Sequence, residues 1–302
     1  MSRMRIAVTG STGLIGSALV RSLLDDGHEV VRLVRREPQE RADGSVEARW
    51  NPPLRAIDRK ALEGVDAAVN LAGAGIGDHR WTAAYKRTLH ESRILSTQTL
   101  AAALAGLEQR PKVLVSASAT GYYGQTGDAV IDEDAPAGGD FLARLCVEWE
   151  QSCAPAADAG IRVAHTRSGI VVDAHGGAFQ RLLPLFKLGL GGRLGNGQQY
   201  WSFISLRDEV AAIRHLIDTD RLSGPFNLTA PVPVTNAEVT TALAKALRRP
   251  AALPVPEFAL RAVLGEMAIE VVGSHRVVPR RLLDSGFRFA HATVDQAVAT
   301  AL

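Results

Sequence analysis

Residues 9–16 decide the fold: they read Thr9-Gly10-Ser11-Thr12-Gly13-Leu14-Ile15-Gly16, with three glycines spaced three residues apart. A β-branched apolar run from Arg5 to Val8 precedes this segment. Apolar residues at helical spacing follow from Leu14 to Asp26, and Gly27 ends that pattern. Glu29 to Val34 then has the composition of a second strand. This order predicts one βαβ unit: a strand, a glycine turn, a helix and a strand.

The three glycines have separate physical roles in such a turn. Gly10 permits the tight turn, Gly13 lacks a Cβ and lets the backbone approach a pyrophosphate, and Gly16 lets the helix pack close to the strand. The helix N-terminus then directs free N–H groups at the phosphates. A glycine turn without a ligand is the alternative, but the position inside a βαβ unit favours a dinucleotide site. The expected contacts are Gly10, Thr12, Gly13, Leu14, Ile15 and Gly16.

The end of the second strand distinguishes NAD from NADP. An acidic residue at this point usually binds the ribose hydroxyls of NAD, whereas this chain has Arg35 and Arg36. A guanidinium pairs well with the 2′-phosphate of NADP through charge-assisted hydrogen bonds, which are often bidentate. Glu37 follows directly and is the competing ribose ligand, although it lies one step past the strand. The sequence therefore predicts NADP(H) as the cofactor.

Strands and helices continue to alternate along the first half of the chain. This alternation predicts an α/β fold with a Rossmann-type, doubly wound parallel sheet. After residue 172, glycines and prolines interrupt the periodicity, so we expect a Rossmann domain over 1–172 and a smaller substrate-side domain over 173–302. The expected later elements are strands at Asp66–Leu71, Lys112–Ser118 and Ile161–Val172, a helix within Trp81–Leu107, and a second helix capped by Asp140.

Composition excludes several other classes of protein. The net charge of +2 favours neither nucleic acid nor an anionic membrane as a partner. No apolar run approaches the roughly 18 residues that a membrane span needs. The eight histidines are scattered, so we expect no metal site. Cys146 and Cys153 are too far apart for a Cys-x-x-Cys pair and suit a reducing compartment. We expect a cytoplasmic protein, assembled as a homodimer, with a small-molecule substrate.

Several further motifs resemble one superfamily, the extended short-chain dehydrogenases/reductases. The chain is most similar to an atypical group within it, the epimerase-family proteins or sugar-nucleotide epimerases, and the similarity covers essentially its whole length. That group carries a C-terminal extension of unknown role, which here corresponds to about 253–298. The motifs that carry the resemblance are Asn70-Leu71-Ala72-Gly73, Ser116 to Gly124, Arg80-Trp81, Ser92-Arg93, Trp149-Glu150, Arg167-Ser168-Gly169 and Gly189-Leu190-Gly191-Gly192.

The resemblance implies cofactor contacts beyond the glycine turn. Leu71, Ala72 and Gly73 would line the cofactor at the end of a middle strand, where sheets of this kind bind their ligands. Arg93 would reach the cofactor from the long helix, and Val171 would lie near the nicotinamide. On its chemistry alone, Arg93 could equally be a salt-bridged helix residue.

The catalytic residues depart from the superfamily pattern. Typical members use a Ser together with Tyr-x-x-x-Lys, in which the Tyr exchanges a proton with the substrate and the Lys lowers the Tyr pKa. Ser118 fits the Ser position, but none of the four tyrosines is followed four residues later by Lys. Leu142 and Cys146 occupy the matching Tyr and Lys positions. Tyr122 and Tyr123 are the nearest substitutes, and the alternative is that they pack the loop beneath the nicotinamide.

Two functions remain open at this point. The first is an NADP-dependent oxidoreductase or epimerase that acts on a small, sugar-like or carbonyl substrate. The second is a non-catalytic protein that senses the NADP redox state and signals through a partner. The retained Ser118 favours the first function, and the missing Tyr–Lys pair favours the second.

Overall fold

The computed structural model describes residues 3–302 and centres on an eight-stranded sheet. The strand order is β11-β7-β6-β5-β1-β2-β3-β4, and every pairing is parallel except that of β3 with β4. The strands are β1 (Arg5–Thr9), β2 (Glu29–Val34), β3 (Val46–Asn51), β4 (Ala56–Ile57), β5 (Ala67–Asn70), β6 (Val113–Ala119), β7 (Arg162–Ser168), β8 (Ile170–Val172), β9 (Tyr200–Trp201), β10 (Phe203–Ser205), β11 (Gly224–Leu228) and β12 (Val234–Thr235).

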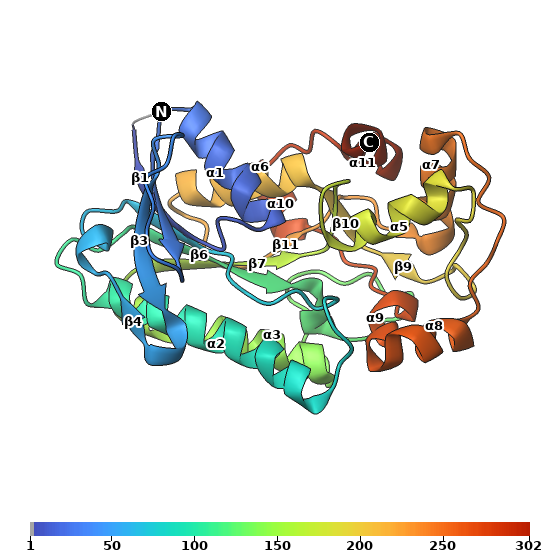
Figure 1. The fold of residues 1–302 in the computed structure, drawn as a ribbon, viewed down its shortest axis with the longest axis horizontal. Helices are drawn as coiled ribbons and strands as arrows, with labels where there is room; N and C mark the ends of the chain where they lie inside the picture. The colour runs from blue at the N-terminus through green and yellow to red at the C-terminus, as the bar shows by residue number, and fades with distance from the viewer. Residues whose placement is uncertain (1–2) are drawn as a thin grey trace.

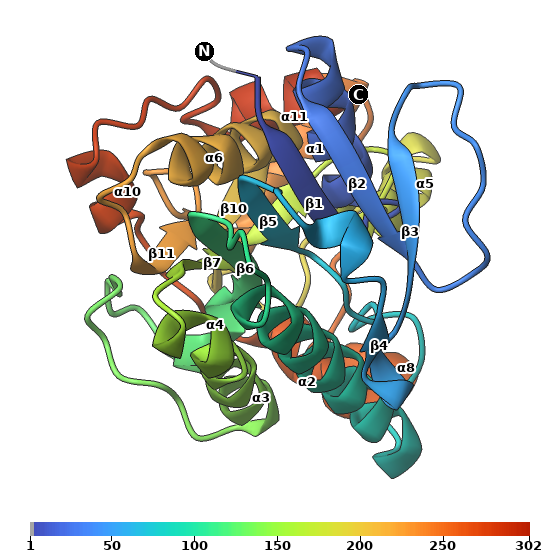
Figure 2. The same cartoon turned by 90° about the vertical axis from the view of Figure 1, so that its left-hand side faces the viewer.

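Helices cover both faces of this sheet, as Figure 2 shows. Leu19 of α1 and Ile213 of α6 are buried in the core on one face, and Leu100 and Leu104 of α2 are buried in the core on the other. The Rossmann-type prediction is therefore confirmed. The helices are α1 (Leu14–Asp25), α2 (Ala83–Ala105), α3 (Phe141–Gln151), α4 (Ala154–Asp158), α5 (Gly177–Lys187), α6 (Leu206–Asp218), α7 (Asn236–Leu247), α8 (Glu257–Leu264), α9 (Ala268–Val272), α10 (Arg280–Asp284) and α11 (Val294–Ala301), with short 3-10 turns η1 (Pro52–Leu54), η2 (Lys60–Leu62), η3 (Thr120–Tyr123) and η4 (Gly265–Met267).

The order of the central strands creates the ligand-binding edge. The strand β1 pairs with β2 on one side and with β5 on the other, so Thr9 lies between Leu33 and Asn70. The strands that follow β1 in the chain are first added on the β2 side of the sheet and then, from β5 onward, on the other side, so the order of strand addition reverses between β1 and β5. Because β1 and β5 are parallel, their carboxyl ends meet at that point. Open α/β sheets bind their ligands at such a switch point.

The strand expected over Ile161–Val172 is wrong as a single element. It divides at Gly169, where β7 stays in the large sheet and β8 leaves to pair with β10. A Cβ on Gly169 would lie 2.4 Å from the carbonyl oxygen of Ser202, so close approach of another chain segment requires glycine at the bend. The chain then returns to the large sheet through α6 and β11. The strand β11, which completes the large sheet, and the helix α6, which covers it, therefore follow residue 172 in the chain.

The remainder of the second half has its own core. Phe179 of α5, Trp201 of β9, Leu243 of α7 and Val298 of α11 are buried together at the end opposite β1 (Figure 1). The C-terminal extension connects this core to the sheet domain, because η4 and α9 pack beside α2 and α3 through Met267 and Ile269. No helix within residues 3–302 is long and apolar enough to cross a membrane.

Candidate functional site

The glycine turn has the geometry that its sequence predicts. Gly10 has a φ of +64°, and a Cβ there would lie 2.5 Å from the Leu71 carbonyl oxygen. A Cβ on Gly16 would lie 2.2 Å from the Gly10 oxygen, so neither position accepts a side chain without a backbone shift. Gly13 has more space and caps α1 without a side-chain hydrogen bond. The first N–H groups of α1 therefore have no side-chain acceptor at this cap, as an anion-binding helix terminus requires.

A cavity of about 690 Å³ opens beside this turn. Its lining extends from the turn to the end of β2 and to α2, where Ser92 and Ser96 line it. It brings together eight of the predicted contacts: Gly10, Thr12, Gly13, Arg35, Arg36, Leu71, Ala72 and Gly73. The other predicted site residues do not line it: Leu14, Ile15, Gly16, Arg93, Ser118, Tyr122, Tyr123 and Val171.

A buried hydrogen-bond cluster holds the edge of the cavity. The Thr9 hydroxyl donates to the Asn70 side-chain oxygen at 2.8 Å and accepts from the backbone N–H groups of Leu71 and Ala72. The Asn70 amide nitrogen in turn donates to Thr97 at 2.8 Å. These contacts tie β1, β5 and α2 together, and they fix the backbone of Leu71 and Ala72 against the cavity.

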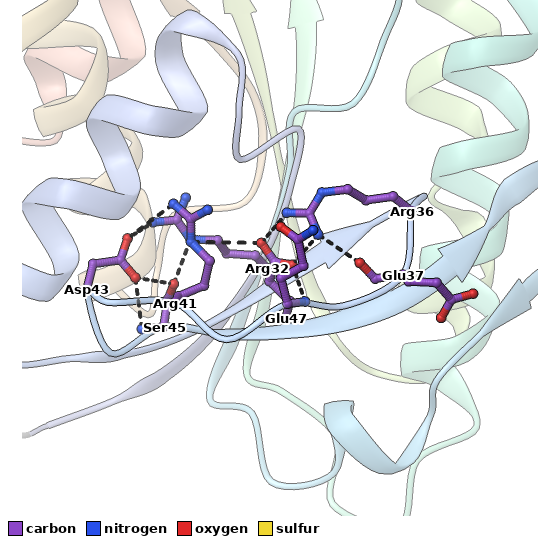
Figure 3. Close-up of polar contacts among 8 residues, drawn as sticks. Arg32, Arg36, Glu37, Arg41, Asp43, Ser45 and Glu47 are labelled. Atoms are coloured by element: carbon purple, nitrogen blue, oxygen red, sulfur yellow. Dashed lines mark hydrogen bonds and ion pairs between the residues drawn. The ribbon is translucent and has the colours of Figure 1, made fainter.

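Charged residues gather at the end of β2 and on the neighbouring strand β3 (Figure 3). The Arg36 guanidinium donates to both carboxylate oxygens of Glu47, at 2.7 and 2.6 Å. These hydrogen bonds hold the pKa of the Glu47 carboxyl below its ordinary value. Glu37, the competing ribose ligand, forms an ion pair with Arg49. Arg35 is exposed and forms no ion pair within residues 3–302.

The predicted catalytic serine belongs to a second, largely buried network. The Ser118 hydroxyl donates to Glu150 at 2.7 Å, and Arg167 donates to both oxygens of the same carboxylate at 2.8 and 2.9 Å. Arg167 also donates to the Tyr123 hydroxyl at 3.0 Å, and that hydroxyl donates to Asn227 at 2.7 Å. One network therefore joins β6, α3, β7, η3 and β11.

The two tyrosines of η3 have different environments. Tyr123 is buried, and this burial raises its pKa to about 12, so its phenol holds its proton firmly at neutral pH. Tyr122 lies under the Arg167 guanidinium, which is 3.4 Å from the ring centroid. Its hydroxyl forms no hydrogen bond to any other residue of the described chain, 3–302. Of the two, Tyr122 has the phenol that is free to meet a ligand.

The helix α3 carries apolar residues where a Tyr–Lys pair would lie. Leu142 packs against Gly121 of η3, and Cys146 is buried, which raises its pKa to about 12. Neither side chain exchanges protons at neutral pH. Glu150 lies eight residues after Leu142 and shares its helix face, which is the signal that would have indicated this carboxylate from the sequence.

The Arg93 side chain lies beside Gly73, one of the predicted cofactor contacts. Its guanidinium is buried, donates to the Leu89 carbonyl at 3.1 Å and stacks on Trp149 at 5.0 Å. Burial lowers its pKa. A Cβ on Gly73 would lie 3.4 Å from the guanidinium carbon, so glycine there lets the arginine approach. No ion pair of Arg93 exists within residues 3–302, although a salt bridge is the alternative that its chemistry suggests.

Comparison with known proteins agrees with this geometry. A family model described as "NAD dependent epimerase/dehydratase family" matches residues 6–228. The chain belongs to this family. A second model, a domain of unknown function (DUF1731), matches residues 255–301 and so covers most of the predicted extension. An epimerase family protein of Mycobacterium tuberculosis is 47% identical over 302 residues, which are 100% of this chain and 98% of the relative.

Two solved structures have the same fold as this chain. The human epimerase family protein SDR39U1, crystallised with NADPH, superposes with a TM-score of 0.91 at 34% identity and covers 99% of both chains. MoeE5, solved with UDP-glucuronic acid and NAD, gives a TM-score of 0.77 at 23% identity over 98% of this chain and 97% of its own. At 23% identity, the similarity to MoeE5 shows a shared fold and nothing more. The predicted resemblance to epimerase-family proteins is therefore confirmed.

Proposed function

We propose that this protein binds NADP(H) in the cavity beside the glycine turn. The observation that carries the proposal is the charge at the end of β2, where Arg35 and Arg36 line the cavity and Glu37 pairs with Arg49. The acidic ribose ligand typical of NAD sites is thus engaged by Arg49. Arg35 forms no ion pair within residues 3–302, and Arg36 uses three of its five donors, so both guanidinium groups keep donors for a 2′-phosphate. The NADPH in the human relative supports the same cofactor.

Each predicted contact has a part in this proposal. The turn and the N-terminus of α1 hold the pyrophosphate through backbone N–H groups. Leu71, Ala72 and Gly73 line the path towards the nicotinamide, with Arg93 beneath Gly73. Val171 of β8 contacts the nicotinamide end. The residues of the turn in this role are Gly10, Thr12, Gly13, Leu14, Ile15 and Gly16.

Calorimetric titration with NADPH and with NADH tests the cofactor. We expect NADPH to bind more tightly, and we expect Arg35→Ala to weaken NADPH binding by about 10- to 100-fold, since a charge-assisted hydrogen bond contributes about 1.5–3 kcal/mol. NADH affinity should stay unchanged. Arg21→Ala, on the exposed side of α1, is the matched control. Tighter binding of NADH by the native protein would contradict the proposal.

We further propose that the bound cofactor exchanges hydride with a small carbonyl or sugar-like substrate. In this reaction the Tyr122 phenol supplies the proton, and the Ser118 hydroxyl exchanges its hydrogen bond to Glu150 for one to the reacting oxygen, which it polarises. The free Tyr122 hydroxyl supports the first role. The firmly held proton of Tyr123 suits a structural hydroxyl, which keeps Arg167 in place. We place the reaction in the cytoplasm and expect a homodimer.

Tyr122→Phe tests the proton donor. NADPH oxidation would be followed by absorbance with a panel of aldehydes, ketones and nucleoside-diphosphate sugars. The variant should lose about 10²- to 10⁴-fold in rate, which is the usual contribution of a positioned general acid. NADPH affinity should stay unchanged, and Tyr85→Phe is the control. Full activity in Tyr122→Phe would exclude this tyrosine.

A non-catalytic NADP(H) sensor is the second function that a specific observation favours. Leu142 and Cys146 stand where the usual acid–base pair would lie, and the Ser118 hydroxyl already donates its proton to a hydrogen bond with Glu150. For a sensor we expect NADPH binding without turnover of any panel compound. For an enzyme, Ser118→Ala should lower turnover and leave cofactor binding intact.

A further inference from the structure

A carboxylate that does not line the cavity binds the guanidinium of Arg36, one of the two arginines at the end of β2. Glu47 of β3 is the register partner of Arg32 on β2, and only 2% of its side chain is exposed. It accepts two hydrogen bonds from Arg36 and a third from the backbone N–H of Gln39 at 2.9 Å. Arg41 lies 3.9 Å from the same carboxylate. Three donors and a further cation therefore converge on Glu47 (Figure 3).

The loop between β2 and β3 has a second anchor at its other end. Arg32 is buried and donates to the Ser45 hydroxyl at 2.8 Å, and Ser45 donates to Asp43 at 2.6 Å. Asp43 also pairs with Arg41 at 3.8 Å. Glu47 and Asp43 together tie the loop back to the strands, so the loop that carries Arg36 has a defined course.

The hydrogen bonds of Arg36 leave one edge of its guanidinium unused. A guanidinium has five N–H donors in a rigid plane. Both donors on Nη1 are engaged, by Glu47 and by the Glu37 carbonyl oxygen, and one donor on Nη2 is engaged by Glu47. The two that remain are Nε–H and the second N–H of Nη2, which lie parallel on the same edge. Such a pair of donors matches two oxygens of a phosphate.

The geometry points to Glu47 as a positioning residue that makes the site selective for a 2′-phosphate. This inference rests on the proposed binding of NADP(H) and adds a residue that does not line the cavity. Glu47 accepts hydrogen bonds from Nη1 and Nη2 of Arg36 and so fixes the orientation of the guanidinium. The unused Nε–H and Nη2–H donors are thereby preorganised for the phosphate. Preorganisation increases affinity because the side chain loses less freedom on binding.

A purely Coulombic account makes the opposite prediction. Glu47 contributes one negative charge near the expected phosphate, so its removal would raise the local positive charge and tighten NADPH binding. Positioning predicts weaker binding, because Arg36 then samples several orientations. The sign of the change in NADPH affinity therefore separates the two accounts.

Titration of Glu47→Gln and Glu47→Asp with NADPH and with NADH tests the inference. Glutamine removes the charge, whereas aspartate keeps the charge and shortens the side chain by one methylene. We expect both variants to bind NADPH about 10-fold more weakly, as the loss of about one good hydrogen bond predicts, with NADH affinity unchanged. Glu37→Gln is the matched control, because the Glu37 carboxylate pairs with Arg49 and not with Arg36.

Three results would overturn the role of Glu47. They are unchanged NADPH affinity in both variants, tighter NADPH binding, and an equal loss for NADPH and NADH, which would indicate a general structural effect. Thermal unfolding shows whether Glu47→Gln and Glu47→Asp are each folded. If one of them is not, the NADPH affinity of the other decides the result. If the native protein itself fails to prefer NADPH, the proposed cofactor is wrong, and the inference fails with it.

Discussion

Arg167→Met should lower the free energy of unfolding by about 3–5 kcal/mol, because removing one partner of a buried ion pair leaves an uncompensated charge. The Arg167 side chain is 4% exposed and that of Glu150 is 12% exposed. The substitution also removes the donor to Tyr123 and the cation that stacks on Tyr122. Urea denaturation at neutral pH measures the loss as a lower transition midpoint.

The double variant Arg167→Met with Glu150→Gln separates the charge from the packing. Glutamine has no charge to leave unpaired, and its amide oxygen still accepts the hydrogen bond from Ser118. We expect the double variant to recover a large part of the lost stability, since removal of both charges of a buried pair costs far less than removal of one. Equal stability of the single and double variants would show that packing, and not the unpaired carboxylate, causes the loss.

The same network shows what the sequence could and could not predict about catalysis. Ser118 is predicted from the resemblance to the superfamily and Tyr123 from its position shortly after Ser118, and the structure places Ser118 near the end of β6 and Tyr123 in η3. Their hydrogen-bond partners are 32 and 104 residues away along the chain. The helical spacing on α3 indicates that Glu150 faces the site, but no pattern near Ser118 or Tyr123 reveals which hydroxyl is hydrogen-bonded. The sequence therefore could not distinguish an occupied hydroxyl from the free one on Tyr122.

The fold was easier to predict from the sequence than the site, because the sequence patterns that determine helices and strands are local. The glycine spacing and the adjacent apolar runs predict β1, α1 and β2 to within about one residue. The strand β3 was missed, although Val46 to Asn51 alternates in burial, because an exposed loop with little periodicity precedes it. The pairing of Arg36 with Glu47 depends on this strand and on its register. The positioning role of Glu47 could therefore only follow from the structure.

The stability of the protein should fall as the pH rises through 8, and Glu209→Gln should remove this fall. Glu209 of α6 is completely buried, accepts one hydrogen bond from Ser168, and has no partner for its second oxygen within residues 3–302. Burial raises its pKa from 4.5 to about 8. The folded state therefore holds this proton more tightly than the unfolded state does, and ionisation favours unfolding.

The sign and the pH window follow from these two pKa values. The stability contributed by protonated Glu209 is fully present below about pH 4.5 and is lost as the pH rises through about 8. At about 1.4 kcal/mol per pKa unit, the total loss is on the order of 5 kcal/mol. Glu270, whose burial raises its pKa to about 7, contributes in the same direction but only up to that pH. The interval from pH 7 to pH 8.5 therefore reports mainly on Glu209.

Thermal unfolding of the native protein and of Glu209→Gln at pH 7 and at pH 8.5 makes the comparison. The native Tm should drop across this interval, whereas the variant Tm should stay nearly level. Glu257→Gln, at an exposed carboxylate that pairs with Arg261, should keep the native pH dependence. An equal drop in the native protein and in Glu209→Gln would show that another group titrates in this interval. Glu209 would then be ionised in the folded state, with partners for its second oxygen.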